Sequence, residues 1–277
     1  MPDPTTAPVR YGQPDAEYRA VDAASYSTLK HILDSPARYL WEKTHPARKA
    51  TFDLGHAVHG MVLDVGEPLH VIDAPDWKTR AAREERDAAY EAGEVPLLSH
   101  QWDQARTCAN RVTTHPLAGP ILTRPGQSEV SIYWDDETTG LPCKARVDRV
   151  TITPDRTHWL VDLKTRGQTA NPATFGRHAA SYGYHMQAAY YRHGYSLAAG
   201  VPFEQVEWLN VVAEIDPPHE VAVCTFDAET MNAGRERWRR ALDLLHHCID
   251  TDDWPGYTPT EAAVVTIPRY ALTEETP

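Results

Sequence analysis

The sequence predicts an α/β fold in which a mixed central β-sheet is flanked by helices. Three observations favour this fold. Apolar residues recur at helical spacing in the first half of the chain, and the pattern changes to alternating apolar and polar residues after Pro125 and Gly126. Helical and strand patterns then follow each other along the second half. A length of 277 residues is within the range that one hydrophobic core can serve, so we expect one large domain.

The first half is expected to be helical. In residues 26–43, apolar side chains at helical spacing are interrupted by Pro36, which predicts a helix, a break and a second helix. Residues 51–64 form another apolar stripe and carry His56 and His59 three positions apart. Two further helices are predicted over 78–94 and 100–112.

The second half predicts a sheet. Three alternating segments separated by turns indicate an antiparallel meander, over residues 129–136, 141–153 and 158–166. One long helix, two further strands and a final amphipathic helix are then expected over 173–199, 206–215, 219–227 and 228–249.

Composition sets the expected boundaries and surroundings. Residues 1–24 are predicted to be a flexible lead-in, because they are rich in proline. A single domain is expected over 25–255, with a helical part at about 25–125 and a catalytic sheet with its helices at about 126–255. Residues 256–277 are predicted to be a tail. No run approaches the ~18 apolar residues of a membrane span, and no signal peptide is visible, so we expect a cytoplasmic protein.

The net charge of −12 argues against a protein that simply coats nucleic acid. It leaves room for an enzyme that meets DNA in a local basic groove, because a sum says nothing about distribution. The four cysteines are far apart in the sequence and include no CxxC pair. We therefore expect thiols in a reducing compartment rather than a metal or disulfide framework.

Two neighbouring strands carry the chemistry. Asp162 and Lys164 are two residues apart, so their side chains point to the same face of a strand. An antiparallel hairpin brings Asp148 beside Asp162, and two adjacent carboxylates favour a hard cation such as Mg²⁺ between them. On its own, the triplet of Asp162 and Lys164 is more typical of a solvated ion pair. Its surroundings decide between the two interpretations.

Several further segments occur in a fixed order around this triplet. They are YSTLKHILDSPARYLWEK, LGHAVHGMVLD, EVSIYW, RVDRV, VDLKT and YHMQAAYYRHG, which together run from about Tyr26 to Tyr191. In this order the chain resembles the PD-(D/E)XK nuclease superfamily, and within it the RecE-like exonucleases of phages and prophages, the exodeoxyribonuclease VIII type. The superfamily's Pro-Asp pair is replaced here by Val147 and Asp148.

The resemblance implies a restriction-endonuclease-like core and a set of site residues. The metal ligands would be His59, Asp148, Asp162 and the backbone carbonyl of Leu163, holding Mg²⁺, for which Mn²⁺ can substitute. Lys164 would activate the water, and Gln187 and Tyr191 would flank the site from one face of a helix. The family motif selects His59 over His56.

Supporting residues are less clearly marked. Glu129 stands at the start of the first strand and is either active-site support or an exposed carboxylate at the strand edge. Hydroxyl, ammonium and guanidinium groups position a DNA backbone without reading bases. Candidates for such phosphate contacts are Ser27, Lys30, Arg38, Arg146 and Arg166.

The resemblance implies a Mg²⁺-dependent exodeoxyribonuclease that acts on double-stranded DNA ends from 5′ to 3′ and leaves 3′ single-stranded overhangs for phage-type recombination. It also implies a ring-shaped homo-oligomer, a RecT-like single-strand annealing partner and a phage or prophage protein in the cytoplasm of a bacterial host. Alternatives are an endonuclease or single-strand DNA nuclease on the same fold, a catalytically silent DNA-end-binding module, and a zinc-dependent hydrolase built on His56 and His59.

Overall fold

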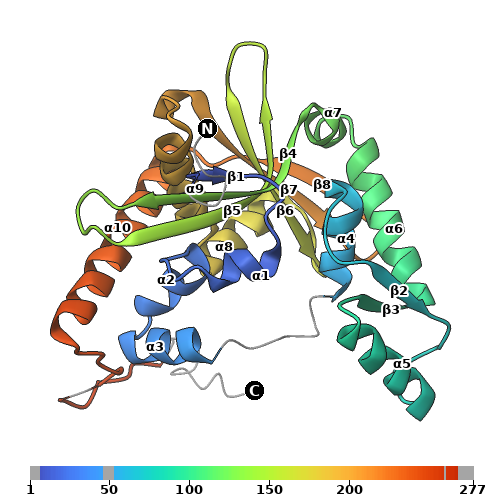
Figure 1. Cartoon of the computed structure of the whole chain (residues 1–277), viewed down its shortest axis with the longest axis horizontal. Coiled ribbons are helices and arrows are strands. Elements are labelled where there is room, and N and C mark those ends of the chain that lie inside the picture. Colours follow the sequence, from blue (N-terminus) through green and yellow to red (C-terminus); the bar gives the residue numbers. More distant parts are fainter. Residues whose placement is uncertain (1–6, 46–52, 259, 268–277) are drawn as a thin grey trace, which may run out of the picture.

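Figure 1 shows the protein as a computed structural model, in which residues 7–45, 53–258 and 260–267 are described. A six-stranded sheet lies between two groups of helices, in the strand order β1-β4-β5-β6-β7-β8. The strands are β1 (Val9–Arg10), β4 (Gly126–Asp135), β5 (Pro142–Ile152), β6 (His158–Arg166), β7 (Val206–Glu214) and β8 (Val221–Cys224).

The sheet is mixed, as the sequence predicts. Strands β4, β5 and β6 form the expected antiparallel meander. Strand β7 then pairs with β6 in parallel and with β8 in antiparallel orientation. The parallel step requires a crossover connection, which is formed by helices α8 (Pro172–Tyr182) and α9 (Tyr184–Ala199). The strands that carry Asp148 and Asp162 therefore lie in the middle of the sheet.

A hydrophobic core covers each face of the sheet. On one face, α2 (Tyr26–Ile32), α9 and α10 (Ala228–Thr251) pack on residues such as Val147, Leu160 and Trp208. On the other face, α4 (Asp53–Leu63), α6 (Ser99–Thr114) and α7 (Ala118–Thr123) pack on Leu163 and Val211. Because Leu160 and Leu163 belong to different cores, the even-numbered side chains at the end of β6 face α9.

The helices of the first half begin as their sequences predict. Ser25 caps α2 in a capping box with Thr28, and Pro36 is the first residue of α3 (Pro36–Thr44), where its missing N–H costs nothing. Helix α5 (Arg80–Glu91) falls within the charge-rich segment 78–94. Within the described ranges, every helix is too short or too polar to span a bilayer.

Two strands within the predicted helical part over 25–125 are missing from the sequence prediction. They are β2 (Leu69–Ile72) and β3 (Val95–Leu98), which pair in parallel as a separate small sheet. Each has only four residues, a length at which strand and helix patterns cannot be told apart. The first half is therefore not helical throughout.

A flexible lead-in is predicted over 1–24, but residues 7–24 contain regular structure. Residues 1–6 lie outside the described ranges. Strand β1 pairs with β4, and α1 (Asp15–Ala20) follows it. Lys144 on β5 donates to the carbonyls of Tyr18, Arg19 and Val21, and Arg146 donates to that of Gln13. These long-range hydrogen bonds hold in place a segment whose own sequence does not predict regular structure.

The single helix expected over 173–199 is also wrong. Gly183 has φ +77° and separates α8 from α9. Glycine adopts this left-handed conformation without steric cost, so the chain turns sharply there. In the predicted tail, the described residues 256–258 and 260–267 contain no helix or strand, and 268–277 lie outside the described ranges.

Candidate active site

Asp162 and Lys164 lie two residues apart on β6, so both side chains face α9, and they contact each other directly. Lys164 Nζ donates to Asp162 Oδ1 at 2.8 Å and to Gln187 Oε1 at 3.1 Å. Gln187 Nε2 donates in turn to Asp162 Oδ1 at 2.9 Å. A closed triangle of acid, lysine and amide results, in which Asp162 and Gln187 are buried and Lys164 is partly buried.

Asp148 lies where the pairing of β5 with β6 ends. The last paired residues are Arg149 and Val161, so the next N–H along β6, that of Leu163, has no backbone partner on β5. Asp148 Oδ2 accepts this N–H at 2.8 Å. The carboxylate thus replaces a backbone hydrogen bond between the two strands. It is held beside Asp162, as the hairpin geometry predicts.

His59 reaches the same place from α4, on the other side of the sheet. Its Nδ1 bonds to the Gly55 carbonyl at 2.9 Å and its Nε2 to the Leu163 carbonyl at 2.6 Å. Nε2 is also 3.6 Å from Asp148 Oδ2. Carbonyl oxygens only accept hydrogen bonds, so both ring nitrogens must donate and the imidazole is positively charged.

The charges of the site shift one another. Burial lowers the pKa of His59, but the hydrogen bond and charge of Asp148 outweigh burial and raise it to about 9. Burial raises the pKa of Asp162 to about 6, with Lys164 opposing and Asp148 adding to the rise. Burial lowers the pKa of Lys164, yet the two aspartates raise it overall. The pKa of Asp148 is lowered in spite of its burial, mainly by His59. Without a metal ion, Asp148 therefore pairs with His59 and Asp162 with Lys164.

Glu129 lies beside Asp148. Ser128 pairs with Arg149 and Val130 with Val147, so Glu129 stands across from Asp148 between these two pairs. Its φ of +50° departs from the strand conformation. Burial and then Asp148 raise the pKa of Glu129 to about 7, against the opposing charges of Arg146 and His59. Of the two interpretations of Glu129, this placement favours active-site support.

Gln187 and Tyr191 lie one turn apart on α9. Gln187 contacts both Lys164 and Asp162, as described above. The Tyr191 ring packs edge-on against Trp208 at 5.7 Å between centroids. Burial raises the pKa of Tyr191 well above its ordinary value, and the charges of Tyr18, Asp162 and Asp148 contribute to the rise.

The five candidate phosphate contacts lie in different settings. Arg146 is committed to Ser131, Asp15 and the Gln13 carbonyl, and therefore anchors the N-terminal segment. Arg166 is 6% exposed and lies two residues beyond Lys164 on the same face of β6. Ser27 and Lys30 lie on α2, where Lys30 Nζ is 5.8 Å from the Tyr26 ring centroid. Arg38 is an exposed residue of α3 that bonds to Tyr257 and pairs with Asp34.

The donor set suits a divalent cation. In the described part of the chain, no three or more His, Cys, Asp and Glu side chains are already arranged to hold a metal ion. The buried Asp162 Oδ2 nevertheless accepts no well-directed hydrogen bond, although Lys164 Nζ is 2.8 Å away. An imidazole, two carboxylates and a carbonyl are ligands that hard and borderline divalent metals accept. Metal binding would require His59 to lose a proton and to give up its hydrogen bond to the Leu163 carbonyl.

Two residues near Lys164 were not anticipated. The Tyr184 ring lies 4.5 Å from Lys164 Nζ. Asn210 stands beside Asp162 in the parallel pairing of β6 and β7, is fully buried, and has no hydrogen-bond partner at either side-chain amide atom. A polar residue in the otherwise apolar run WLNVVA was the available signal for Asn210. No sequence signal marked Tyr184, because an unbroken helix is predicted there.

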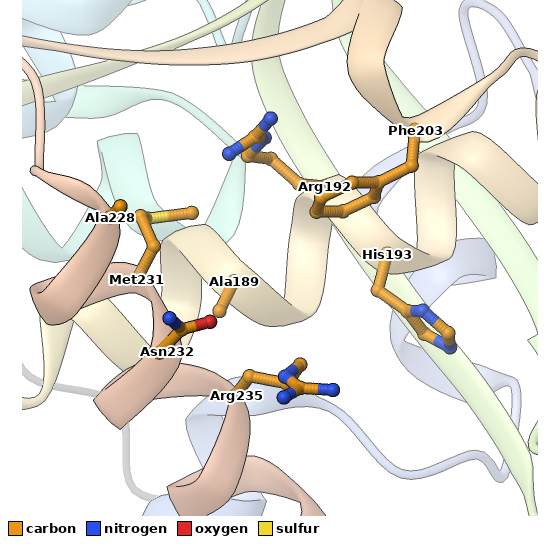
Figure 2. A pocket seen from close by; sticks show the side chains of 8 residues that line it. All are labelled: Ala189, Arg192, His193, Phe203, Ala228, Met231, Asn232 and Arg235. Atoms are coloured by element: carbon orange, nitrogen blue, oxygen red, sulfur yellow. The ribbon is translucent and has the colours of Figure 1, made fainter.

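A cavity of about 320 Å³ lies between α9 and α10, with Phe203 of the short 3₁₀ helix η2 (Phe203–Gln205) at its edge (Figure 2). Its α9 residues, Ala189, Arg192 and His193, are on the side of the helix roughly opposite Gln187 at 100° per residue. No carboxylate lines it. This cavity is therefore separate from the place where Asp148, Asp162 and Lys164 meet.

Comparison with known proteins identifies the core. Residues 25–264 match the family described as "PDDEXK-like domain of unknown function (DUF3799)". No curated protein matches the sequence. A crystal structure from Eubacterium rectale, described as "Putative exonuclease", is similar with a TM-score of 0.56 at 12% identity, covering 95% of this chain and 96% of that chain. The crystal structure of SSO0001 is 14% identical over 70% of this chain and 84% of that chain, but its TM-score of 0.31 supports no argument.

The first of these structures shows a shared fold, and the family match covers both strands of the candidate site. The expected α/β core, with a mixed central sheet flanked by helices, is thereby confirmed. The chain belongs to the DUF3799 family of PDDEXK-like domains.

Proposed function

We propose that this protein is a metal-dependent exodeoxyribonuclease that hydrolyses phosphodiester bonds at the ends of double-stranded DNA. The observation that carries the proposal is the meeting of Asp148, Asp162 and Lys164 in the middle of a PDDEXK-like core, with His59 reaching them from α4. Proteins with this core typically use divalent metals, and the donor set here is suited to one.

His59, Asp148, Asp162 and the Leu163 carbonyl would hold the metal, which we propose is Mg²⁺, with Mn²⁺ able to substitute. When bound, a divalent ion stabilises negative charge on the phosphoryl group and lowers the pKa of bound water. Lys164 Nζ, held as an ammonium by its aspartate partners, would orient the attacking water, and would take its proton once a bound cation draws those carboxylates away. Gln187 fixes Lys164 against Asp162 through its two hydrogen bonds, and Tyr191 closes the same side.

The finer features of the activity rest on the motif resemblance. We propose 5′ to 3′ polarity, 3′ overhangs as product, a ring-shaped homo-oligomer around the duplex, and work with a RecT-like annealing protein in phage-type recombination inside a bacterial host. A basic channel within an acidic exterior would reconcile DNA binding with the net charge of −12. Arg166, Ser27, Lys30 and Arg38 are the proposed phosphate contacts.

The test is degradation of a linear duplex labelled separately at its 5′ and 3′ ends, beside a covalently closed circle. Wild type is compared with His59→Ala and with His56→Ala, a matched control on the same helix, in Mg²⁺, Zn²⁺ or EDTA. We expect Mg²⁺-dependent loss of the 5′ label first, an intact circle, an inactive His59→Ala and an active His56→Ala.

Other outcomes point to the alternatives. Cutting of the circle would identify an endonuclease, and preference for unpaired DNA a single-strand nuclease. Activity with Zn²⁺ that both histidine variants abolish would support a zinc-dependent hydrolase. If wild type binds DNA ends but cuts no substrate under any metal, the protein is a silent end-binding module and the proposal fails.

A further inference from the structure

Two tyrosines form a row where α8 meets α9, and a histidine packs against both of them. The ring centroids of Tyr184 and Tyr182 are 5.8 Å apart, and the His178 ring is stacked on Tyr182 at 4.2 Å and lies 5.7 Å from Tyr184. At the inner end, the Tyr184 ring is 4.5 Å from Lys164 Nζ. Farther along the row, Tyr182 is 53% exposed. The row therefore leads from the candidate catalytic lysine to the surface.

The backbone of this junction is fixed from both sides. Gly183, at φ +77°, ends α8 by donating its N–H to the Ala179 carbonyl. The Tyr26 hydroxyl of α2 donates to the Tyr182 carbonyl at 2.6 Å. Glycine adopts this conformation at no steric cost. The rings are thus held in place before any ligand arrives.

Core packing accounts for one end of the row only. Buried Phe175 stacks on Tyr184 at 6.1 Å, which ties the inner ring to a small hydrophobic core. Tyr182 belongs to none of the three hydrophobic clusters found among the described residues. An exposed aromatic ring that contributes nothing to a core, yet is held next to a catalytic lysine, is placed as a binding surface would be.

Positive charge lies alongside the row. Burial lowers the pKa of His178, and the charge of nearby Arg166 lowers it further. Arg166 also opposes the rise that burial causes in the pKa of Tyr184. This arginine is 6% exposed, and its Nη1 has no hydrogen-bond partner. Flat aromatic faces beside buried cations complement a nucleotide, which joins a flat base to an anionic phosphate.

We propose that the row of Tyr184 and Tyr182, with His178 beside it, binds an unpaired nucleobase of the DNA strand that is cut, with the base stacked on Tyr182. This inference rests on the proposed nuclease function and specifies the state of its substrate. A base stacked there would place its strand next to Lys164, so the preferred substrate would be a duplex whose terminal pairs have opened.

The test measures equilibrium binding with Ca²⁺ in place of Mg²⁺, so that binding is read separately from cleavage. One duplex is fully paired, and a second has mismatched terminal pairs with 2-aminopurine at the unpaired 5′ position. Tyr182→Ala is compared with wild type, with Tyr182→Phe, which keeps the ring, and with Tyr11→Ala, which removes an aromatic residue that is 59% exposed beyond the far end of α9.

We expect wild type to quench the 2-aminopurine and to bind the mismatched end more tightly than the paired end. Tyr182→Ala should weaken binding of the mismatched end by a factor of about 5 to 150, the value of one stacked base. Tyr182→Phe and Tyr11→Ala should bind as wild type does, and binding of the paired duplex should change little in any variant.

Three results would overturn the inference: no quenching by wild type, unchanged binding of the mismatched end by Tyr182→Ala, or equal weakening of both duplexes, which would indicate a contact with the duplex itself. Cleavage in Mg²⁺ distinguishes the two proposals. If DNA is cut but the Tyr182 effect is absent, the stacking surface fails alone. If the Tyr182 effect is present and nothing is cut, the nuclease proposal fails alone.

Discussion

Two lysines on adjacent strands, the buried Lys144 on β5 and the partly buried Lys164 on β6, differ in the partners that surround them. Lys144 Nζ donates to three backbone carbonyls, at 2.9, 3.3 and 2.6 Å. Lys164 Nζ instead binds the side chains of Asp162 and Gln187. Each ammonium also lies near a tyrosine ring, at 4.7 Å from Tyr18 and 4.5 Å from Tyr184.

The partners decide what each lysine can do. All three donors of Lys144 are used by neutral groups whose positions are fixed by α1 and the residues after it, and burial lowers its pKa. This lysine fastens the N-terminal segment to the sheet. Lys164 is held by the carboxylate of Asp162, and a bound cation can compete for that carboxylate. Side chains can exchange partners in this way, whereas the backbone carbonyls at the end of α1 that hold Lys144 are fixed in position. A buried lysine with removable acidic partners is suited to chemistry.

Two buried aspartates show the same contrast. Asp136 accepts from Arg239 at 2.6 Å and from the N–H and hydroxyl of Thr139 at 2.9 and 2.7 Å. Burial opposes these bonds, but together they lower its pKa to about 2. Asp162 retains a buried oxygen without a hydrogen bond and has a raised pKa. Asp136, whose oxygens are bonded, maintains the fold, whereas Asp162 retains an oxygen without a hydrogen bond at the candidate site.

The largest effect should follow replacement of Lys164. Lys164→Met should lower the rate of DNA cleavage by about 10²–10⁴-fold, the usual contribution of a group that transfers a proton in the reaction. The rate of nucleotide release from linear duplex measures it. Lys78→Met, at a lysine on the surface that pairs with nearby Asp76, is the matched control and should cleave as wild type does.

Replacement of Lys144 should affect stability instead. Lys144→Met leaves three partly buried carbonyls without their donor, which should lower the free energy of unfolding by on the order of 3 kcal/mol. Urea denaturation measures the change. Below the unfolding transition, the cleavage rate should remain within tenfold of wild type. A variant that unfolds normally but cleaves no DNA would reverse the roles assigned to the two lysines.

The pH dependence of stability should depend on Asp136. Because its pKa is lowered in the folded protein, its contribution is fully present above about pH 4 and is lost as the pH falls towards 2. Between these limits, wild type should lose about 2 kcal/mol of unfolding free energy that Asp136→Asn does not lose. Parallel stability curves for the two proteins would show that the ion pair with Arg239 contributes nothing.

The smallest effect should be a gain. Asn210→Leu removes a buried amide without partners and keeps the branched shape, so the free energy of unfolding should rise by about 1 kcal/mol. The exposed Asn232→Leu on α10 is the control and should change it by less than about 0.5 kcal/mol. A loss of stability in Asn210→Leu would show that a bound water satisfies the amide of Asn210.

The sequence was informative where local patterns determine structure. Ser25 and Pro36 place the starts of α2 and α3, and strict alternation identifies the meander and puts Asp162 and Lys164 on one face. The meeting of Asp148 with Asp162 follows from the hairpin. The motif order drew attention to His59, whose approach from the opposite side of the sheet no local pattern reveals.

Features that depend on distant contacts could not be predicted. Strand β1 has two residues and α1 buries none, so both depend on distant contacts, β1 on its pairing with β4 and α1 on the bonds from Lys144 and Arg146. For the same reason Arg146, a candidate phosphate contact, is engaged internally. The sequence around Gly183 is compatible with a continuous helix as well as with a break. In the structure the helix is interrupted at Gly183, and the Tyr26 hydroxyl donates a hydrogen bond to the Tyr182 carbonyl beside this break, where the aromatic row lies.

Asp162 tests the account most directly, since it binds Lys164 and Gln187 and is a proposed metal ligand. The measurement is nucleotide release from linear duplex DNA in Mg²⁺ by wild type and Asp162→Asn, with the melting temperature of each sample recorded. We predict release by wild type, at least about 100-fold slower release by the variant, and folded protein in both. Release at the wild-type rate by Asp162→Asn would contradict the account.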